Sequence, residues 1–369
     1  MPAPQLTRDQ VDALQGELDA LRNEVVADLG ERDARYIRRT VRGARASAIA
    51  GRSLLAFGFD PFTWIAGVIA LATAKILDNM EIGHNVIHGQ YDWMNDPALN
   101  SQTYEWDHVN CTDHWRYSHN YRHHTYTNIQ GKDDDLGYGV LRISGRQRWK
   151  PYFLLQPVWN ALLAVLFQWG VGVQELKIDR WAAGRMSTRE LTQRARPFVR
   201  KAARQLFKDY ALFPAVCFWN APRVFLGNLV ANGIRALWTY GIIFCGHFTG
   251  GVRIFTKEET ANETRGDWYL RQIQGSSNIE GGRLFHLLSG NLSHQIEHHL
   301  FPDIPAHRHA EIAPRVRALC AKYGVRYNTG RFTVQFASVL LRIFRHALPS
   351  RAPESRSPRG PMGAEPQGA

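Results

Sequence analysis

Cysteine is scarce in this 369-residue chain, and its few positions argue against two common uses of the residue. The chain has four cysteines, with no pairing motif and none inside the histidine clusters described below: Cys111, Cys217, Cys245 and Cys320. A disulfide framework is therefore not expected, and the thiols are predicted to be reduced in a cytoplasm-facing protein. The same placement argues against a zinc site built on thiolates.

Signals of several other protein classes are also missing. We find no internal repeat and no glycine-rich nucleotide loop, since Gly275-Ser276-Ser277 reads only as a turn. The first 45 residues are polar and charged and lack the apolar centre of a secretory signal. The net charge is +12, yet no nucleic-acid recognition motif accompanies it. A nucleic acid is therefore not expected as a partner.

The positive charge is concentrated in two segments, residues 32–52 and 177–208. Cations that flank apolar spans usually mark the cytoplasmic side of a membrane. Such a surface also suits anionic lipid headgroups, a phosphorylated substrate or an acidic protein partner.

Long apolar runs occupy residues 47–79, 152–175 and 209–247. About 20 apolar residues form one helical crossing of a bilayer. The first run is long enough for two helices separated by an FDPF turn, and the second supports about one crossing. The third is broken at WNAPR before a long apolar stretch. We predict an all-α integral membrane protein with roughly four transmembrane helices. A soluble all-α protein with buried helices is the alternative.

Three regions are predicted along the chain. Residues 1–45 form an amphipathic N-terminal cytoplasmic segment, residues 46–345 the membrane domain, and residues 346–369 a disordered tail rich in Pro, Ser, Gly and Arg. Within the first region, Thr7 is a candidate helix cap. Apolar residues then recur at helical spacing, at Val11, Leu14, Leu18, Leu21 and Val25.

Histidines are abundant and clustered. Eight of the 15 fall in three short segments: GHNVIHGQ with His84 and His88, HNYRHHTYTN with His119, His123 and His124, and HQIEHHLFPD with His294, His298 and His299. On a helix, the i and i+4 members of each segment face the same cavity. Imidazole suits iron, copper, zinc and nickel, and eight rings are enough for two ions with open positions. A cytoplasmic helical cap is therefore predicted to hold a histidine-ligated di-metal site.

The three clusters must meet on one side of the membrane, which creates a difficulty at residues 152–175. A single crossing there would place the basic stretch Lys177–Lys208 outside, against the usual distribution of cations. The other possibility is that residues 152–175 are re-entrant or interfacial. The sequence leaves both possibilities open.

The clusters GHNVIHGQ, DHWRYSHNYRHHTYTN and NLSHQIEHHLFPDIP resemble the three histidine boxes of the membrane-bound fatty acid desaturases, nearest to bacterial enzymes of actinobacterial type. The resemblance covers roughly residues 50–320. It implies a centre of two iron ions that uses O2 to remove two hydrogens from an acyl chain. It also implies ligand roles for His84, His88, His119, His123, His124, His298 and His299.

Two further ligand assignments follow from the same resemblance. His247, in FCGHF, stands where related enzymes place a histidine of the last transmembrane helix. The third box begins with His or Gln three residues before its His-His pair, which here is Gln295. We choose the adjacent His294 because of its i,i+4 relation to His298. The remaining histidines, together with Asp133, Asp134, Asp135 and Glu297, are expected to orient the ligands, cap helices or face solvent.

The resemblance also implies partners. A fatty acyl substrate should occupy a narrow apolar tunnel, carried by CoA, carrier protein or phospholipid. No cytochrome b5 module with an HPGG motif is present, so electrons should come from a ferredoxin-like donor with its reductase. The nearest alternative is a lipid hydroxylase or ketolase of the same di-iron type. A more distant alternative is a non-catalytic metal-binding membrane protein such as a transporter.

Overall fold

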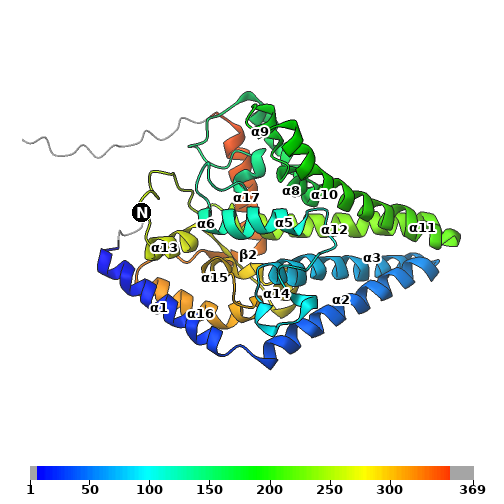
Figure 1. Ribbon diagram of the computed structural model, residues 1–369, viewed down its shortest axis with the longest axis horizontal. Coiled ribbons are helices and arrows are strands. Elements are labelled where there is room, and N and C mark those ends of the chain that lie inside the picture. The colour runs from blue at the N-terminus through cyan, green and yellow to red at the C-terminus, as the bar shows by residue number, and fades with distance from the viewer. Residues whose placement is uncertain (1–5, 350–369) are drawn as a thin grey trace, which may run out of the picture.

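The computed structural model describes residues 6–349 and is mainly helical (Figure 1). Most of the predicted C-terminal tail, residues 350–369, lies outside the described residues. The two short strands β1 (Asn278–Glu280) and β2 (Thr329–Arg331) pair in parallel, with Ile279 opposite Gly330. Most of the helices fall into three groups, which are a wedge of long helices, a layer that carries the histidines, and a smaller set beside the wedge.

The wedge consists of long helices that run side by side away from the rest of the protein (Figure 1). Its members are α2 (Glu31–Phe57), α3 (Pro61–Ile76), α10 (Thr188–Phe207) with its continuation α11 (Phe213–Val216), and α12 (Ala221–His247). Helices α2 and α3 approach closely at two glycines. A Cβ on Gly51 would lie 2.6 Å from the backbone nitrogen of Leu71 and 2.9 Å from the carbonyl oxygen of Gly67. Only glycine fits this crossing.

Within residues 6–349, two helices are long and apolar enough to cross a membrane, Pro61–Ile87 and Phe218–His247. A third candidate, Pro151–Val165 with Phe167–Gln174, is bent by 100°. The remaining apolar stretches are the ends of longer helices, α2 and α10–α11, whose other ends are charged. Length and composition therefore identify two or three spans, and the count of four stays a prediction.

Charged side chains inside the wedge are paired across its helices. The Lys75 ammonium on α3 lies 2.8 Å from the Asp209 carboxylate, which also contacts Arg52 of α2 at 3.3 Å. The Asn232 amide of α12 donates to the same carboxylate at 3.1 Å. A buried ion that lost these partners would be strongly destabilising, so the network ties four helical segments together.

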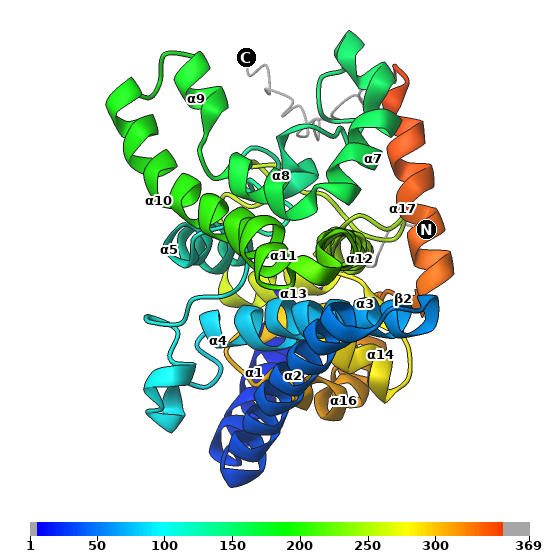
Figure 2. The same ribbon diagram turned by 90° about the vertical axis from the view of Figure 1, so that its right-hand side faces the viewer.

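The histidine layer lies at the wide end of the wedge. Its helices are α4 (Asn85–Ile87), α5 (Thr112–Trp115), α6 (His124–Tyr126), α13 (Arg265–Gly275), α14 (Arg283–Leu288), α15 (Gln295–Leu300) and α16 (His309–Lys322). Two π-helical segments, Leu77–His84 and Arg116–His123, lead into α4 and α6. The third group is α7 (Gln156–Val165), α8 (Phe167–Gln174), α9 (Ile178–Ala182) and α17 (Phe332–Ala347), of which α7 and α17 pack beside α12 (Figure 2).

The N-terminal helix α1 (Arg8–Ala27) forms where the sequence predicts it. Thr7 caps the helix through a reciprocal pair of hydrogen bonds with Gln10. Its apolar stripe packs against α13 and α16, with Leu14 and Leu18 fully buried. The stripe is therefore covered by the protein itself.

Truncation of this stripe should loosen α1. Leu18→Ala should cost about 2–5 kcal/mol, because the side chain is fully buried and leaves a cavity. The thermal unfolding midpoint of the purified protein in detergent should fall by several degrees. Val26→Ala, at a 39% exposed position on the same helix, is the matched control and should change the midpoint little. Equal midpoints for both variants would contradict the docking.

Candidate metal centre

The three histidine clusters and His247 converge in the histidine layer. Potential ligand atoms form three groups, within each of which the atoms lie no more than 4.8 Å apart. Two groups consist of histidines alone, and the third, made of His119, His123 and Asp135, overlaps both. The first group contains His84, His88, His119 and His298, and the second contains His123, His247 and His299. Segments that are more than 200 residues apart in the sequence therefore supply one site. The two all-histidine groups share no residue, so they could form two separate metal positions, and the number of two ions stays a prediction.

Local backbone geometry places the first two clusters. His84 ends one π-helix, and the other π-helix runs from Arg116 to His123. A π-helix is rare and is frequently found at functional sites. The rings of His84 and His88 have centroids 4.6 Å apart, and those of His119 and His123 are stacked at 5.0 Å.

His124 lies between the two groups without belonging to either. Its ring stacks on His299 at 4.3 Å and meets the rings of His88 and His298 edge-on at 4.7 and 4.8 Å. Both of its ring nitrogens are buried and make no hydrogen bond to the described residues. Its position suits a ligand to either metal position.

The structure does not bring His294 into either group. The i,i+4 relation to His298 assumed a continuous helix, but the chain forms a 3-10 turn over Leu292–His294 and α15 begins only at Gln295. The His294 ring turns away and stacks on His286 at 4.6 Å. Gln295 enters the site instead, with its amide nitrogen 2.9 Å from Nε2 of His247. The non-helical backbone of His294 is the physical reason for this difference.

Polar neighbours fix the orientation of four rings through their Nδ1 atoms. Asn85 Oδ1 lies 3.0 Å from His84, Asp135 3.3 Å from His119, and Asp133 3.1 Å from His123. Gln272 Oε1 lies 3.1 Å from Nδ1 of His299. Such contacts leave Nε2 free to face a metal. Asn85 lies inside the first box and Gln272 has no spacing signal, so the sequence analysis predicts an orienting role for Asp133 and Asp135 but not for these two amides.

The other acidic candidates have different roles. Asp134 turns away from the histidines and pairs with Arg122 at 2.8 Å and Lys177 at 3.2 Å. Glu297 is buried and accepts hydrogen bonds from Asn278 and Tyr327, both at 2.8 Å. These bonds hold α15 against β1, since Asn278 Oδ1 also accepts from the Ile296 backbone at 2.8 Å.

Burial keeps most of these imidazoles neutral. Loss of solvent lowers the pKa well below its ordinary value, and the neighbouring rings lower it further, for His88, His119, His124, His298 and His299. Burial is the largest single influence on His123 and acts to lower its pKa, but the charge of Asp133, its hydrogen bond and the charge of Asp135 together raise the pKa above its ordinary value. Neutral imidazole is the form that binds a metal, so the rings outside the Asp133 contact are ready to do so at neutral pH.

The donor set fits two metal ions. In the first group, the Nε2 atoms of all four histidines are buried and make no hydrogen bond to the described residues: His84, His88, His119 and His298. Buried polar atoms are ordinarily paired, so unpaired lone pairs that converge on one point are typical of metal ligands. All seven grouped residues offer imidazole nitrogen, which suits iron, copper, zinc and nickel.

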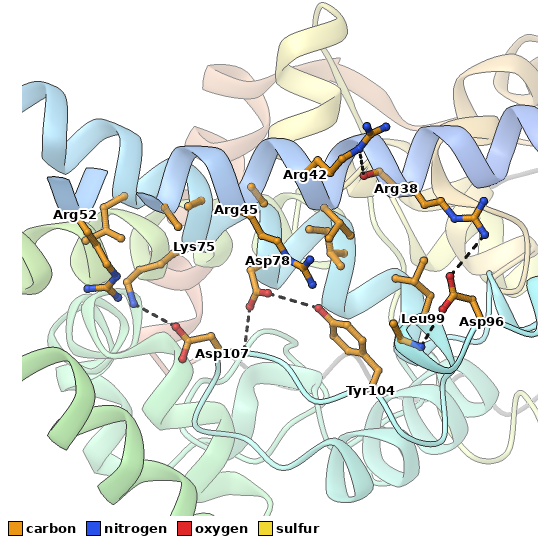
Figure 3. A pocket seen from close by; sticks show the side chains of 17 residues that line it. Arg38, Arg42, Arg45, Arg52, Lys75, Asp78, Asp96, Leu99, Tyr104 and Asp107 are labelled. Atoms are coloured by element: carbon orange, nitrogen blue, oxygen red, sulfur yellow. Dashed lines mark hydrogen bonds and ion pairs between the residues drawn. The ribbon is translucent and has the colours of Figure 1, made fainter. Parts of the chain in front are cut away.

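A cavity of about 540 Å³ opens beside the site, between α2, α3 and residues 96–107 (Figure 3). Its wall combines apolar residues such as Leu71, Ile82 and Leu99 with the arginines of one side of α2. Figure 3 shows Arg45 reaching across the cavity toward Asp78 and Tyr104. The cavity therefore offers both apolar surface and positive charge.

Aromatic rings connect the cavity with the histidines. Tyr104 lines the cavity and packs against the cluster that contains Trp106 and Trp115. The Trp115 ring stacks on His119 at 4.2 Å and meets His84 at 5.2 Å. An apolar chain in the cavity would thus approach the first histidine group through an aromatic wall.

Comparison with known proteins agrees with this geometry. The family model for fatty acid desaturases matches residues 62–331. The chain is 47% identical over 366 residues to the NADPH-dependent stearoyl-CoA 9-desaturase of Mycobacterium tuberculosis, an alignment that covers 96% of this chain and 86% of that protein. It is also 27% identical to the sn-1 linoleoyl-lipid 6-desaturase of Synechocystis, over 72% of this chain and 75% of that protein.

The family match covers most of the chain and includes all three boxes and His247, and the mycobacterial relative aligns over nearly the full length. With two apolar spans beneath two groups of buried imidazoles, the chain is a membrane enzyme and belongs to the fatty acid desaturase family.

Proposed function

We propose that the protein is an O2-dependent acyl-CoA desaturase with a centre of two iron ions. The convergence of seven imidazoles in two groups carries this proposal, and the similarity to a stearoyl-CoA 9-desaturase supports the acyl-CoA and the 9-position. In the reaction, two C–H bonds on adjacent methylenes break and a C=C bond forms. Two electrons from a donor and two protons from solvent then balance the reduction of O2 to two molecules of water.

We assign one iron to His84, His88, His119 and His298 and the other to His123, His247 and His299, with His124 available to either. When bound, the irons supply the activation of O2 and the oxidation of the acyl chain. Our assignment leaves out His294, because its ring packs on His286 outside both groups. Asn85, Asp133, Asp135 and Gln272 hold the ligand rings in orientation.

The cavity beside α2 is our candidate for the substrate entrance. The apolar wall suits the acyl chain, and the arginines suit the phosphates of CoA. Tyr104, Trp106 and Trp115 would shield the reacting methylenes from water. This arrangement favours an acyl thioester with an anionic carrier over a neutral lipid.

Electrons are proposed to come from a separate ferredoxin-like donor and its reductase, and the relative is described as NADPH-dependent. Exposed cations of α9 and α10, including Arg180, Arg189 and Arg200, form a surface that suits an acidic donor. We place the centre on the cytoplasmic side of the cell membrane, where such donors and acyl-CoA occur. The contact between Lys177 and Asp134 supports this, because it keeps the basic stretch beside the histidines.

The ligand assignment predicts different outcomes for two histidines four residues apart. His298→Ala removes one of four grouped ligands, so activity should fall more than about 100-fold and bound iron should fall below about two per chain. His294→Ala is the control, and it should keep its iron because its ring lies outside both groups. Iron per chain is measured by mass spectrometry of the purified proteins. Iron loss in His294→Ala would return His294 to the ligand set, and zinc or copper in the wild type would contradict iron.

The reaction is tested on its product. Cells that express the wild type, supplied with a ferredoxin and its NADPH-dependent reductase, should accumulate octadecenoyl chains with the double bond at C9. Cells that express His298→Ala should not. Gas chromatography–mass spectrometry of total acyl chains locates the bond. Hydroxylated or ketonised lipid would instead favour the alternative oxygenase, and a bond at another carbon would contradict the proposed position.

The substrate entrance is tested at Arg45. Arg45→Ala should raise KM for stearoyl-CoA by about tenfold and leave kcat unchanged, because the guanidinium would meet the carrier and not the acyl chain. Arg39→Ala, on the same helix but outside the cavity lining, should leave KM unchanged. Steady-state kinetics with stearoyl-CoA and with stearoyl-pantetheine separates the phosphates from the thioester. An unchanged KM for stearoyl-CoA in Arg45→Ala would exclude this entrance.

A further inference from the structure

On α7 and its flanking residues, the polar side chains face the protein interior and the apolar side chains are exposed. Gln156 is fully buried and donates to the backbone carbonyl oxygens of Arg142 and Ile343, both at 2.8 Å. Asn160 is also buried and accepts from the Tyr240 hydroxyl at 2.7 Å. The exposed positions are instead large and apolar: Leu154, Leu155, Val158, Trp159, Leu162, Val165 and Leu166. This is the reverse of the pattern on a helix that faces water.

Helix α17, which packs against α7, repeats the pattern. Its Gln335 is buried and donates to the Asn278 carbonyl oxygen at 3.3 Å. The Arg342 guanidinium turns inward and binds the carbonyl oxygens of Thr249 and Val252 at 2.8 and 2.9 Å. Outside lie Val334, Leu341 and Phe344, each more than half exposed. The two helices together present one apolar surface, which we call the α7–α17 platform.

Ion pairs tie both ends of the α7–α8 segment to the side of the protein that carries the histidines. Before the segment, Arg146 pairs at 2.9 Å with Glu259, in the loop between the His247 end of α12 and the start of α13. After the segment, Lys177 pairs with Asp134 at 3.2 Å. The intervening chain bends by 100°, and the ten residues of α7 rise only about 15 Å, half the thickness of a bilayer core. The segment therefore enters and leaves on the side of the histidines and does not cross.

The platform packs against the part of α12 where this spanning helix should leave the hydrocarbon core of the bilayer. Trp238 follows Phe218, the start of this span, by 20 residues, a rise of about 30 Å that equals the thickness of the core. At this level Asn160 of α7 binds Tyr240, and the rings of Phe332 and Phe336 of α17 meet Trp238 and Tyr240 at 6.3 and 6.2 Å. Figure 2 shows α12 end-on and both platform helices lengthwise, so they run across the span.

We propose that the α7–α17 platform lies in the membrane interface, embedded in the leaflet next to the histidine layer. Its apolar surface continues that of the spanning helix α12, whose Leu229, Ile234 and Leu237 are exposed below it. Exposed cations stand near its ends, with Lys150 over the Tyr152 ring at 6.0 Å and Arg345 on α17. Aromatic and cationic residues of this kind occupy the headgroup level, and the cations favour anionic phospholipid.

Nitroxide labels measure the environment of the platform. The full-length protein with Cys217→Ser is labelled at Val158→Cys, Val165→Cys or Leu341→Cys and reconstituted in nanodiscs that contain phosphatidylglycerol. Collision rates with O2 and with a water-soluble nickel chelate give the depth of each label. Labels at Leu229→Cys in the span and at exposed Glu258→Cys are the lipid and water references. If a label on α7 disturbs folding, Leu162→Cys replaces it, and Phe344→Cys replaces the label on α17.

All three platform labels should collide more with O2 than with the nickel chelate. Val158 and Val165 lie two turns apart on one side of α7, so they should have the same depth within a few Å. A crossing helix would separate them by about 10 Å, which would overturn the proposal. Water-like collisions at the three labels would also overturn it. Protection of the labels from both reagents would overturn the proposal too, because it would mean that protein covers the surface.

Discussion

The need to bury many imidazoles together, uncharged and correctly turned, governs the arrangement of this protein. A buried imidazolium would repel its neighbours, and a buried neutral ring with no partner loses its hydrogen bonds to water. Burial lowers the pKa of rings such as His298 and His299, so these rings stay uncharged and do not repel one another. Several rings each keep one hydrogen-bond partner on the side away from the centre, for example Asn85 for His84 and Gln272 for His299. The inward nitrogens are left for metal.

The other parts of the fold support this centre from different sides. The wedge supplies His84 and His247 from the ends of its two apolar spans, and buried ion pairs around Asp209 hold its helices together. Helix α15 supplies His298 and His299 and is fixed by Asn278 and Glu297. The second box is held from the loop behind it, where Asp133 binds His123 and also accepts from the Asn128 backbone at 2.8 Å. Each ligand segment therefore has its own anchor.

Much of this could be predicted from sequence, because clustered histidines and long apolar runs are strong local signals. The helical class, the helix capped by Thr7 and the meeting of the three boxes belong to that part. The position of His294 outside both histidine groups could not be predicted, because a helix that begins only at Gln295 leaves no mark in the spacing of the histidines. The path of residues 152–175 was also undecidable, since an apolar run looks the same whether it crosses or lies flat. Our interfacial placement of this segment rests on the ion pairs of Arg146 and Lys177, which the sequence pattern does not reveal.

The distribution of the ligand groups along the chain has a consequence for biosynthesis. The first group joins His84 to His298, and the second joins His123 to His299. During translation, neither group can be complete until the ribosome has passed residue 299 and α15 has emerged. Until then, the histidines of the first two boxes lack their partners from α15. A metal that needs a complete group can therefore bind only after most of the polypeptide has been made.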